Sequence, residues 1–187
     1  MKLLEDKILN DGIILNNEII KVDNFLNHQI DVSLINEIGK DIAKHFPMAT
    51  KVVTIETSGI AIAYATCLAL SNCPLVYAKK QASKITSDTN YTAKAKSFTK
   101  GFVYEIRIDK KYLSPNDKVL IVDDFLAAGN AGVGLIELIK KSGAEIVGFA
   151  CAIEKGFQKG RNEIEKLGVK VYSCANILSF KDNKPVF

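Results

Sequence analysis

The sequence predicts an α/β protein whose central, mainly parallel β-sheet is flanked by helices. Short apolar runs rich in β-branched residues, typical of strands buried on both faces, alternate along the chain with segments whose apolar residues recur at helical spacing. Several of these runs are followed at once by a loop of small or polar residues that opens a helix. This order is typical of strand, crossover helix and parallel strand units with right-handed connections.

Length and composition limit the possible classes of protein. The 187 residues, with 48% hydrophobic and 25% charged residues, fit one soluble domain spanning 1–187. The net charge of +4 comes from lysines spread along the chain, which favours an anionic small molecule over nucleic acid. The longest nearly apolar stretch, 59–78, is broken by Asn72-Cys73-Pro74, so we expect no membrane span. Four cysteines without CxxC spacing predict core thiols in a reducing cytoplasm.

The first quarter of the chain is predicted to contain a helix, a hairpin and a second helix. Apolar residues recur at helical spacing from Leu3 to Leu9, and Asn16-Asn17 is typical of the turn between two short strands. Either Asp31 or Ser33 can cap the second helix. Its apolar positions form one stripe: Leu34, Ile35, Ile38 and Ile42.

Two further strands end beside groups that can bind an anion. The strand predicted at 51–56 runs into Thr57-Ser58-Gly59 at the start of a helix, where free N–H groups favour an anion. Taken alone this is weak evidence, because hydroxyl residues begin many helices. The next strand, Pro74–Ala78, ends at Lys79 and Lys80. Paired lysines are usually only solvated, but at the carboxyl end of a strand they can neutralise a departing anion.

The segment 118–134, KVLIVDDFLAAGNAGVG, is the most informative stretch of the chain. The apolar run Val119–Val122 predicts a buried central strand, and Asp123 and Asp124 stand at its end, where open α/β sheets bind ligands. A loop of small residues then leads into a helix: Ala127, Ala128, Gly129, Asn130 and Ala131. The carboxylates can accept hydrogen bonds from sugar hydroxyls and the loop can wrap a phosphate. Together with the 57–59 turn, they suit a ribose that carries phosphate at both ends.

The rest of the chain supplies one long loop and further strands and helices. Between 81 and 99 the composition changes to Ser, Thr, Lys and Asn, which predicts a flexible loop able to close over the site. Later segments alternate: strand 102–108, helix 133–139, strand 146–153, helix 162–167, strand 169–172 and an apolar piece at 177–180. The strand at 146–153 ends in Glu154-Lys155-Gly156-Phe157.

These motifs resemble those of the type I phosphoribosyltransferases. VLIVDDFLAAGNAG is similar to the family signature of a hydrophobic strand, two acidic residues and a small-residue loop. The loop departs from the commonest form, which has threonines and paired glycines where this chain has Ala127, Ala128 and Asn130, so more of the phosphate binding falls to backbone N–H groups. The segments KVDNFLNHQID, KSFTK and EKGFQKG make the whole chain similar to the xanthine-specific bacterial members.

The resemblance implies a fold, a reaction and a set of roles. It implies the type I phosphoribosyltransferase fold, with a hood over the base formed mainly by residues 1–36 and a mobile catalytic loop at 81–99. The implied reaction moves the 5-phosphoribosyl group of phosphoribosyl pyrophosphate to N9 of xanthine in a homodimer. Mg²⁺ would be bound mostly by the diphosphate, with sparse protein ligands and no dedicated metal site. The implied roles are catalysis by Asp123 and Asp124, phosphoribosyl pyrophosphate binding by 127–131, 57–59 and Lys80, and xanthine binding by Ile20, Asn27, Lys155 and Phe157.

Alternatives remain open at this point. Guanine and hypoxanthine share the 6-carbonyl of xanthine, and only the hood and Lys155 favour xanthine. Purine repressors of some bacteria use the same fold to sense phosphoribosyl pyrophosphate without catalysis, but they place a DNA-binding domain before it, for which we expect this chain has no room. A nicotinamide dehydrogenase is disfavoured because no GxGxxG opens a strand and helix unit.

Overall fold

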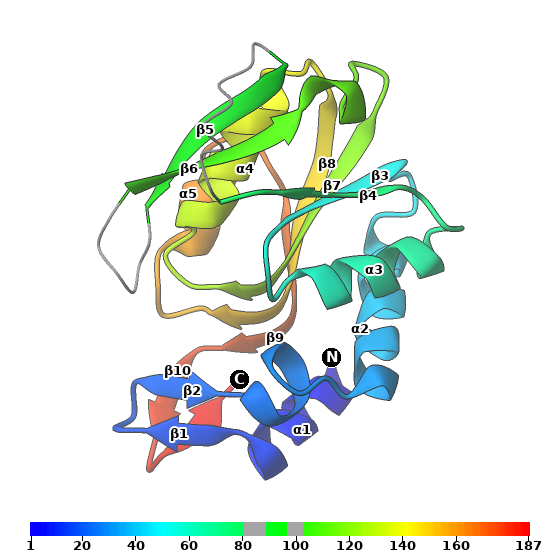
Figure 1. The fold of residues 1–187 in the computed structure, drawn as a ribbon. Coiled ribbons are helices and arrows are strands. Elements are labelled where there is room, and N and C mark those ends of the chain that lie inside the picture. Colours follow the sequence, from blue (N-terminus) through cyan, green and yellow to red (C-terminus); the bar gives the residue numbers. More distant parts are fainter. Residues whose placement is uncertain (81–88, 97–102) are drawn as a thin grey trace.

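The computed structural model describes residues 1–80, 89–96 and 103–187, and its centre is a parallel sheet. Five strands lie in the order β4-β3-β7-β8-β9, and every neighbouring pair is parallel (Figure 1). Their bounds are β3 Lys51–Ile55, β4 Leu75–Ala78, β7 Lys118–Leu126, β8 Glu145–Lys155 and β9 Val171–Ile177. The predicted α/β class with a mainly parallel sheet is therefore confirmed.

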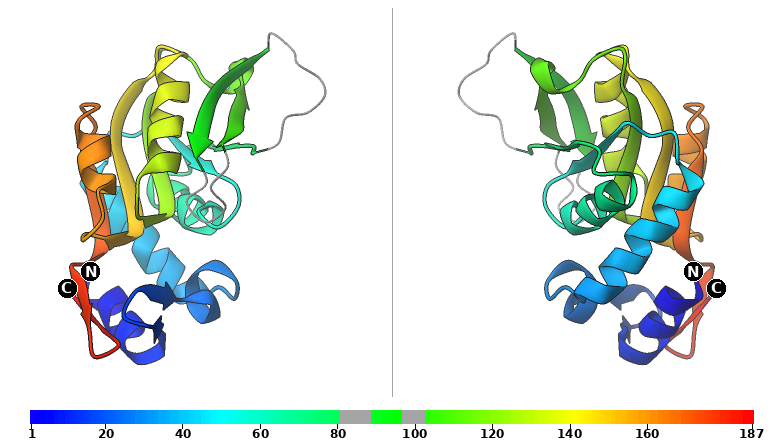
Figure 2. Two further views of the ribbon diagram at one scale, coloured as in Figure 1. Left: turned by 90° about the vertical axis from the view of Figure 1, so that its left-hand side faces the viewer. Right: turned by 90° about the vertical axis from the view of Figure 1, so that its right-hand side faces the viewer.

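Helices cover both faces of this sheet and enclose two apolar cores. The helices are α2 Val32–His45, α3 Ile60–Ala69, α4 Asn130–Lys140 and α5 Gly160–Glu165. One core contains residues of α2, α3 and the N-terminal elements, and the other contains residues of α4 and α5 (Figure 2). The chain passes from β3 to its neighbour on one side and from β7 to its neighbour on the other. The gap between β3 and β7 is thus the topological switch point, where open α/β sheets bind ligands.

The two ends of the chain form a layer beside the carboxyl ends of the strands (Figure 1). The N-terminal part comprises α1 Lys2–Asp11, β1 Ile13–Leu15, β2 Ile19–Lys21 and the π-helical turn η1 Asp23–Asn27. β1 and β2 pair antiparallel around Asn16 and Asn17, both with positive φ, as their sequence predicts. A C-terminal hairpin, β10 Ser179–Lys181 and β11 Lys184–Val186, lies next to it. The sequence predicted an apolar piece at 177–180 in this region, not the two strands of the hairpin.

Part of the predicted 81–99 loop is a strand instead. β5 Asn90–Lys96 pairs antiparallel with β6 Val103–Asp109, which is followed by the short 3-10 helix η2 Lys110–Tyr112. Ala93 and Ala95 are buried on one side of β5, and Ala95 packs against Gly134 of α4. Two alanines give little apolar contrast, so the alternation was not recognised in the sequence. The remaining residues of the predicted loop, 81–88 and 97–99, lie outside the described part of the chain.

The structure corrects one predicted boundary and selects between two candidate residues at another. β7 does not end before the acidic pair but continues through Asp123 and Asp124 to Leu126, because β8 keeps pairing with it as far as Glu154. At α2, the capping residue is Asp31, whose Oδ1 accepts a hydrogen bond from the Leu34 N–H at 3.1 Å.

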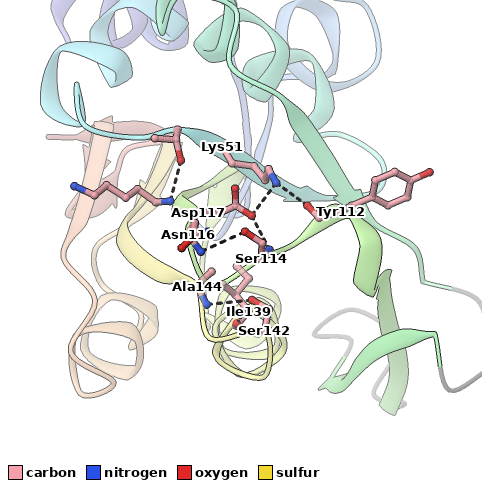
Figure 3. Close-up of polar contacts among 10 residues, drawn as sticks. Lys51, Tyr112, Ser114, Asn116, Asp117, Ile139, Ser142 and Ala144 are labelled. Carbon is pink, nitrogen blue, oxygen red and sulfur yellow. Dashed lines mark hydrogen bonds and ion pairs between the residues drawn. The ribbon is translucent and has the colours of Figure 1, made fainter.

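A polar cluster fixes the opposite, amino end of β7 (Figure 3). Lys51 Nζ lies 2.8 Å from Asp117 Oδ2 and donates a second hydrogen bond to the carbonyl of Tyr112 at 2.8 Å. Asp117 also accepts a hydrogen bond from the Ser114 N–H at 2.7 Å. Since Lys51 begins β3 and Asp117 precedes β7, this ion pair ties together the two strands that flank the switch point.

The four cysteines are free thiols, as predicted. Cys67, Cys151 and Cys174 are buried, whereas Cys73, in the connection between α3 and β4, is partly exposed. Within the described ranges, no helix has both the length and the apolar character needed to span a membrane.

Candidate active site

The acidic pair lies near the carboxyl end of β7 and is almost completely enclosed. Asp123 is 7% exposed and Asp124 is 8% exposed. The Asp124 N–H donates a hydrogen bond to Asp123 Oδ1 at 3.0 Å, and Asn27 Nδ2 of η1 donates to Asp124 Oδ2 at 3.3 Å. Burial, together with the neighbouring charge of Asp124, raises the pKa of the Asp123 carboxyl well above its ordinary value. The pair therefore links the central strand to the N-terminal layer.

The 127–131 loop forms a small cavity that includes Asp123. Gly129 has a φ of +83°, a left-handed conformation that suits glycine, and α4 begins at the next residue, Asn130. Together with its neighbours the loop lines a cavity of about 130 Å³. The described lining residues are Asp123, Phe125, Leu126, the five loop residues 127–131, Gly132 and Phe149. Asp123 and the N-terminus of α4 thus border one space.

The 57–59 turn lies against the same acidic pair. The turn follows β3, contains a cis peptide between Glu56 and Thr57, and places Gly59 just before α3. A Cβ atom at Gly59 would lie 2.6 Å from Thr54 Oγ1 and 2.9 Å from Asp123 Oδ1. These distances leave no room for a side chain, so glycine allows the backbone to approach the carboxylate. Both turns that were predicted to bind an anion therefore lie against Asp123.

Lys80 follows the end of β4 and lies near this group. Its positive charge acts on Asp123, where it opposes the rise in pKa caused by burial. The Lys80 N–H donates to Glu56 Oε1 at 2.5 Å, and its Nζ lies 5.9 Å from the centre of the Tyr104 ring. The backbone contact to Glu56 thus fixes Lys80 next to the 57–59 turn.

The residues predicted to bind the base differ in how far their side chains are free to do so. Lys155, at the end of β8, is partly buried, which lowers its pKa, while the charge of Glu18 in the β1–β2 turn opposes that shift. Ile20 is only 7% exposed and packs in the core under the N-terminal layer, so little of it can face a base. Phe157 is 46% exposed, and its ring packs edge-on against Phe180 of β10, with centroids 5.5 Å apart.

A comparison with protein families identifies this arrangement. Residues 21–182, most of the chain, match the model of the phosphoribosyl transferase domain. The chain belongs to the phosphoribosyl transferase family. The matched region contains the switch point, both turns and the acidic pair. The expected type I fold is therefore confirmed for this phosphoribosyltransferase.

Relatives of this phosphoribosyltransferase are similar to it over their full length. A protein of Clostridium botulinum named xanthine phosphoribosyltransferase 2 is 52% identical over 190 residues, covering all of both chains. Proteins named xanthine phosphoribosyltransferase from Clostridium novyi and Streptococcus pneumoniae are 47% and 50% identical; they cover all of this chain and 99% and 97% of their own.

Solved structures of the family agree in fold. Adenine phosphoribosyltransferase from Rhodothermus marinus superposes with a TM-score of 0.74 at 20% identity, covering 95% of this chain and all of the other. The Saccharomyces cerevisiae enzyme superposes with a TM-score of 0.72 at 22% identity, covering 92% of this chain and 99% of the other.

Several residues near the site were not singled out in the sequence. Glu18 acts on Lys155 and Tyr104 lies beside Lys80, but both come from segments distant in sequence from these lysines. Gly160 packs against the 127–131 loop, and a Cβ atom there would lie 2.3 Å from the Ala127 carbonyl. In the sequence Gly160 lies just before the predicted helix 162–167, and no local pattern marked it.

Proposed function

We propose that this protein is a xanthine phosphoribosyltransferase. It transfers the 5-phosphoribosyl group of phosphoribosyl pyrophosphate to N9 of xanthine, giving xanthosine 5′-monophosphate and pyrophosphate in purine salvage. The observation that carries this conclusion is the 46–52% identity, over the whole chain, to relatives named for this activity. The acidic pair between two anion-binding turns is the arrangement that such a substrate needs.

The two turns would hold the two phosphorylated ends of the pentose. The 127–131 loop has a cavity of about 130 Å³ at the N-terminus of α4, which suits the 5-phosphate. Thr57, Ser58 and Gly59, with Lys80 beside them, suit the pyrophosphate, because a departing polyanion needs N–H donors and a positive charge. Asp123 between the turns would then lie at the sugar itself.

Asp123 and Asp124 would act on the ribose by hydrogen bonding and by charge. Their carboxyl groups suit the 2- and 3-hydroxyls, and they lie close to the anomeric carbon, where positive charge develops as the pyrophosphate departs. The reaction needs no protein nucleophile, since N9 of the base attacks the same carbon. The contribution of the protein is to orient both substrates and to stabilise charge.

Asn27 and Lys155 would select the base. An amide can both donate and accept, so Asn27 can read a purine edge while it also contacts Asp124. The Lys155 ammonium suits the extra 2-carbonyl of xanthine and the acidity of that purine. Ile20 would contribute little contact area because it is buried, and Phe157 would have to leave Phe180 to stack on a base.

Magnesium would enter with the diphosphate of the substrate. The chemistry of the site fits a hard cation, since Asp123 and Asp124 supply oxygen ligands beside the pyrophosphate turn. Among the described residues no group of three or more His, Cys, Asp or Glu side chains converges on a metal position. Bound Mg²⁺ would stabilise the negative charge of the leaving pyrophosphate.

An assay that offers xanthine, guanine, hypoxanthine and adenine together, with labelled phosphoribosyl pyrophosphate and Mg²⁺, tests this function. We expect xanthosine monophosphate to be the dominant product. Preferential labelling of another nucleotide would replace xanthine by that purine. Binding of phosphoribosyl pyrophosphate without pyrophosphate release would instead favour a sensor of the purine-repressor type.

The protein is further proposed to act in the cytoplasm as a homodimer of single-domain subunits, in which the N-terminal layer serves as the hood. α3 supports the dimer because it is apolar on its outer side as well: Tyr64 is 58% exposed and Leu68 is 47% exposed. Exposed apolar surface of this kind commonly marks an interface. Light scattering should give twice the subunit mass of 20.5 kDa, and the subunit mass alone would exclude the dimer.

A further inference from the structure

A half-buried arginine pairs with a buried carboxylate next to Gly160, the residue that contacts the 127–131 loop. Arg161 of α5 forms two parallel hydrogen bonds to Glu154 of β8, from Nε to Oε1 at 2.8 Å and from Nη2 to Oε2 at 2.5 Å. Glu154 is 2% exposed, and its Oε2 also accepts a hydrogen bond from Ser173 Oγ at 2.6 Å. Arg161 Nη1 donates to the Val171 carbonyl at 3.1 Å. From its place on α5, the guanidinium thus bonds to both β8 and β9 and fixes the position of α5 relative to these strands.

This pair holds the residue that touches the 127–131 loop. Gly160 directly precedes Arg161, and its N–H donates to the Ala127 carbonyl at 3.0 Å. Gly129 of the loop also approaches Gly160 closely, since a Cβ atom at Gly129 would lie 3.0 Å from the Gly160 backbone. The position of Gly160, and hence of its hydrogen bond, is set by the neighbouring Arg161 and its buried carboxylate.

The Gly160 contact determines where the loop directs its donors. In a planar trans peptide the C=O and N–H point in opposite directions, so fixing the Ala127 carbonyl towards Gly160 turns the Ala128 N–H away from it. Ala127, Ala128 and Gly129 line the 130 Å³ cavity, and Gly160 is not among its described lining residues. Alanine side chains offer no donors of their own. The capacity of the loop to bind an anion therefore depends on the orientation of its backbone.

We propose that Glu154 and Arg161 are positioning residues for phosphoribosyl pyrophosphate: their ion pair fixes Gly160 against Ala127 and so directs the backbone N–H groups of the 127–131 loop at the 5-phosphate. This inference rests on the proposed function of that loop. It assigns no contact with substrate to either side chain. A purely structural pair would change the stability of the protein without changing how tightly this substrate is bound.

The test compares two carboxylates that bond to the same guanidinium. Glu154→Gln keeps the shape of the buried partner but removes its charge, and Arg161→Lys keeps the charge but removes the two-pronged geometry. The matched control is Glu165→Gln, because Glu165 is exposed and lies 3.2 Å from Arg161 Nη1. We expect the first two variants to raise the KM for phosphoribosyl pyrophosphate about tenfold and leave the KM for xanthine within about twofold. The control should change neither value.

A milder variant and a binding measurement keep the outcome interpretable. Ser173→Ala removes one contact to Glu154 and should raise the same KM by a smaller factor even if the other variants do not fold. Calorimetric titration with phosphoribosyl pyrophosphate alone reports the same loss of affinity without turnover, so it stays valid if the wild-type enzyme proves to use a different base. An affinity for phosphoribosyl pyrophosphate equal to that of the wild type in the folded variants would overturn the proposal.

Discussion

At the scale of single residues, the charge of Lys155 is expected to determine which base is used. Lys155→Met keeps most of the aliphatic stem and removes the ammonium. A hydrogen bond to a charged group contributes enough that the KM for xanthine should rise about 10- to 100-fold, with a much smaller change for hypoxanthine. Lys159→Met, in the same turn but exposed, is the control. Equal losses for both purines in steady-state kinetics would refute the assignment.

The second carboxylate of the acidic pair allows an almost isosteric test. Asp124→Asn retains an oxygen that can accept the hydrogen bond from Asn27, so the fold should persist. Because the negative charge near the anomeric carbon is lost, kcat should fall by roughly a hundredfold or more. Circular dichroism and thermal unfolding would establish that the variant is folded. A variant with the wild-type rate would remove Asp124 from the mechanism.

At the scale of elements, the approach of the 57–59 turn to β7 should not tolerate a methyl group. In Gly59→Ala the new Cβ would meet Thr54 and Asp123, and relieving such overpacking costs about 1–3 kcal/mol. Because the turn must move, the KM for phosphoribosyl pyrophosphate should rise as well. Gly168→Ala is the comparison: nothing lies within 4 Å of its Cβ position, but its φ is +81°. It should lose stability with an unchanged KM, and a similar KM in both variants would contradict the prediction.

Local patterns were sufficient to predict most elements but not all. The apolar runs of β3, β7 and β8 and the stripe of α2 could be recognised because each stands out within a few residues. β5 could not, since its buried face consists of alanines, and β7 was predicted too short because acidic residues are seldom found inside a strand. Pairing with β8, a partner that local sequence does not show, keeps Asp123 and Asp124 in the strand.

The residues of the candidate site divide in the same way, into those that local sequence predicts and those that it does not. Asp123, Asp124 and the two turns could be predicted because each belongs to a contiguous motif beside a strand. Their convergence follows from the order of the strands, which the sequence shows only indirectly. The partners of Lys80, Lys155 and Arg161 come from other elements, and no local pattern pairs them. Phe157 shows the remaining difficulty, because an aromatic residue that the sequence predicts to stack on a base can equally pack on protein, as it does here on Phe180.

At the scale of the whole molecule, the Lys51–Asp117 pair should make stability depend on acid. Burial alone would raise the pKa of Asp117, but the hydrogen bonds from Lys51 and Ser114 outweigh it and lower the pKa below its ordinary 3.8. A carboxylate with a depressed pKa contributes stability that is present above the unfolded value and is lost as the pH falls through the folded value. The free energy of unfolding should therefore lose this contribution below about pH 3.8.

Urea unfolding of Asp117→Asn measures this contribution. We expect a loss of about 1–3 kcal/mol relative to the wild type near neutral pH, and a smaller difference when both proteins are unfolded at about pH 2.5. Asp109→Asn is the control, because Asp109 pairs at 3.5 Å with a Lys111 side chain that is 65% exposed. A difference that is the same at both pH values would show that the stabilisation is not ionic.

The unequal exposure of the four thiols has a practical consequence. Cys73 is partly exposed, and a hydrogen bond from Cys67 lowers its pKa, so it holds the most reactive sulfur of the set. A maleimide dye should couple there first while Cys67, Cys151 and Cys174 stay shielded. If the protein is the proposed homodimer, fluorophores attached at this point, next to α3, would report its subunit exchange by energy transfer without any engineered cysteine.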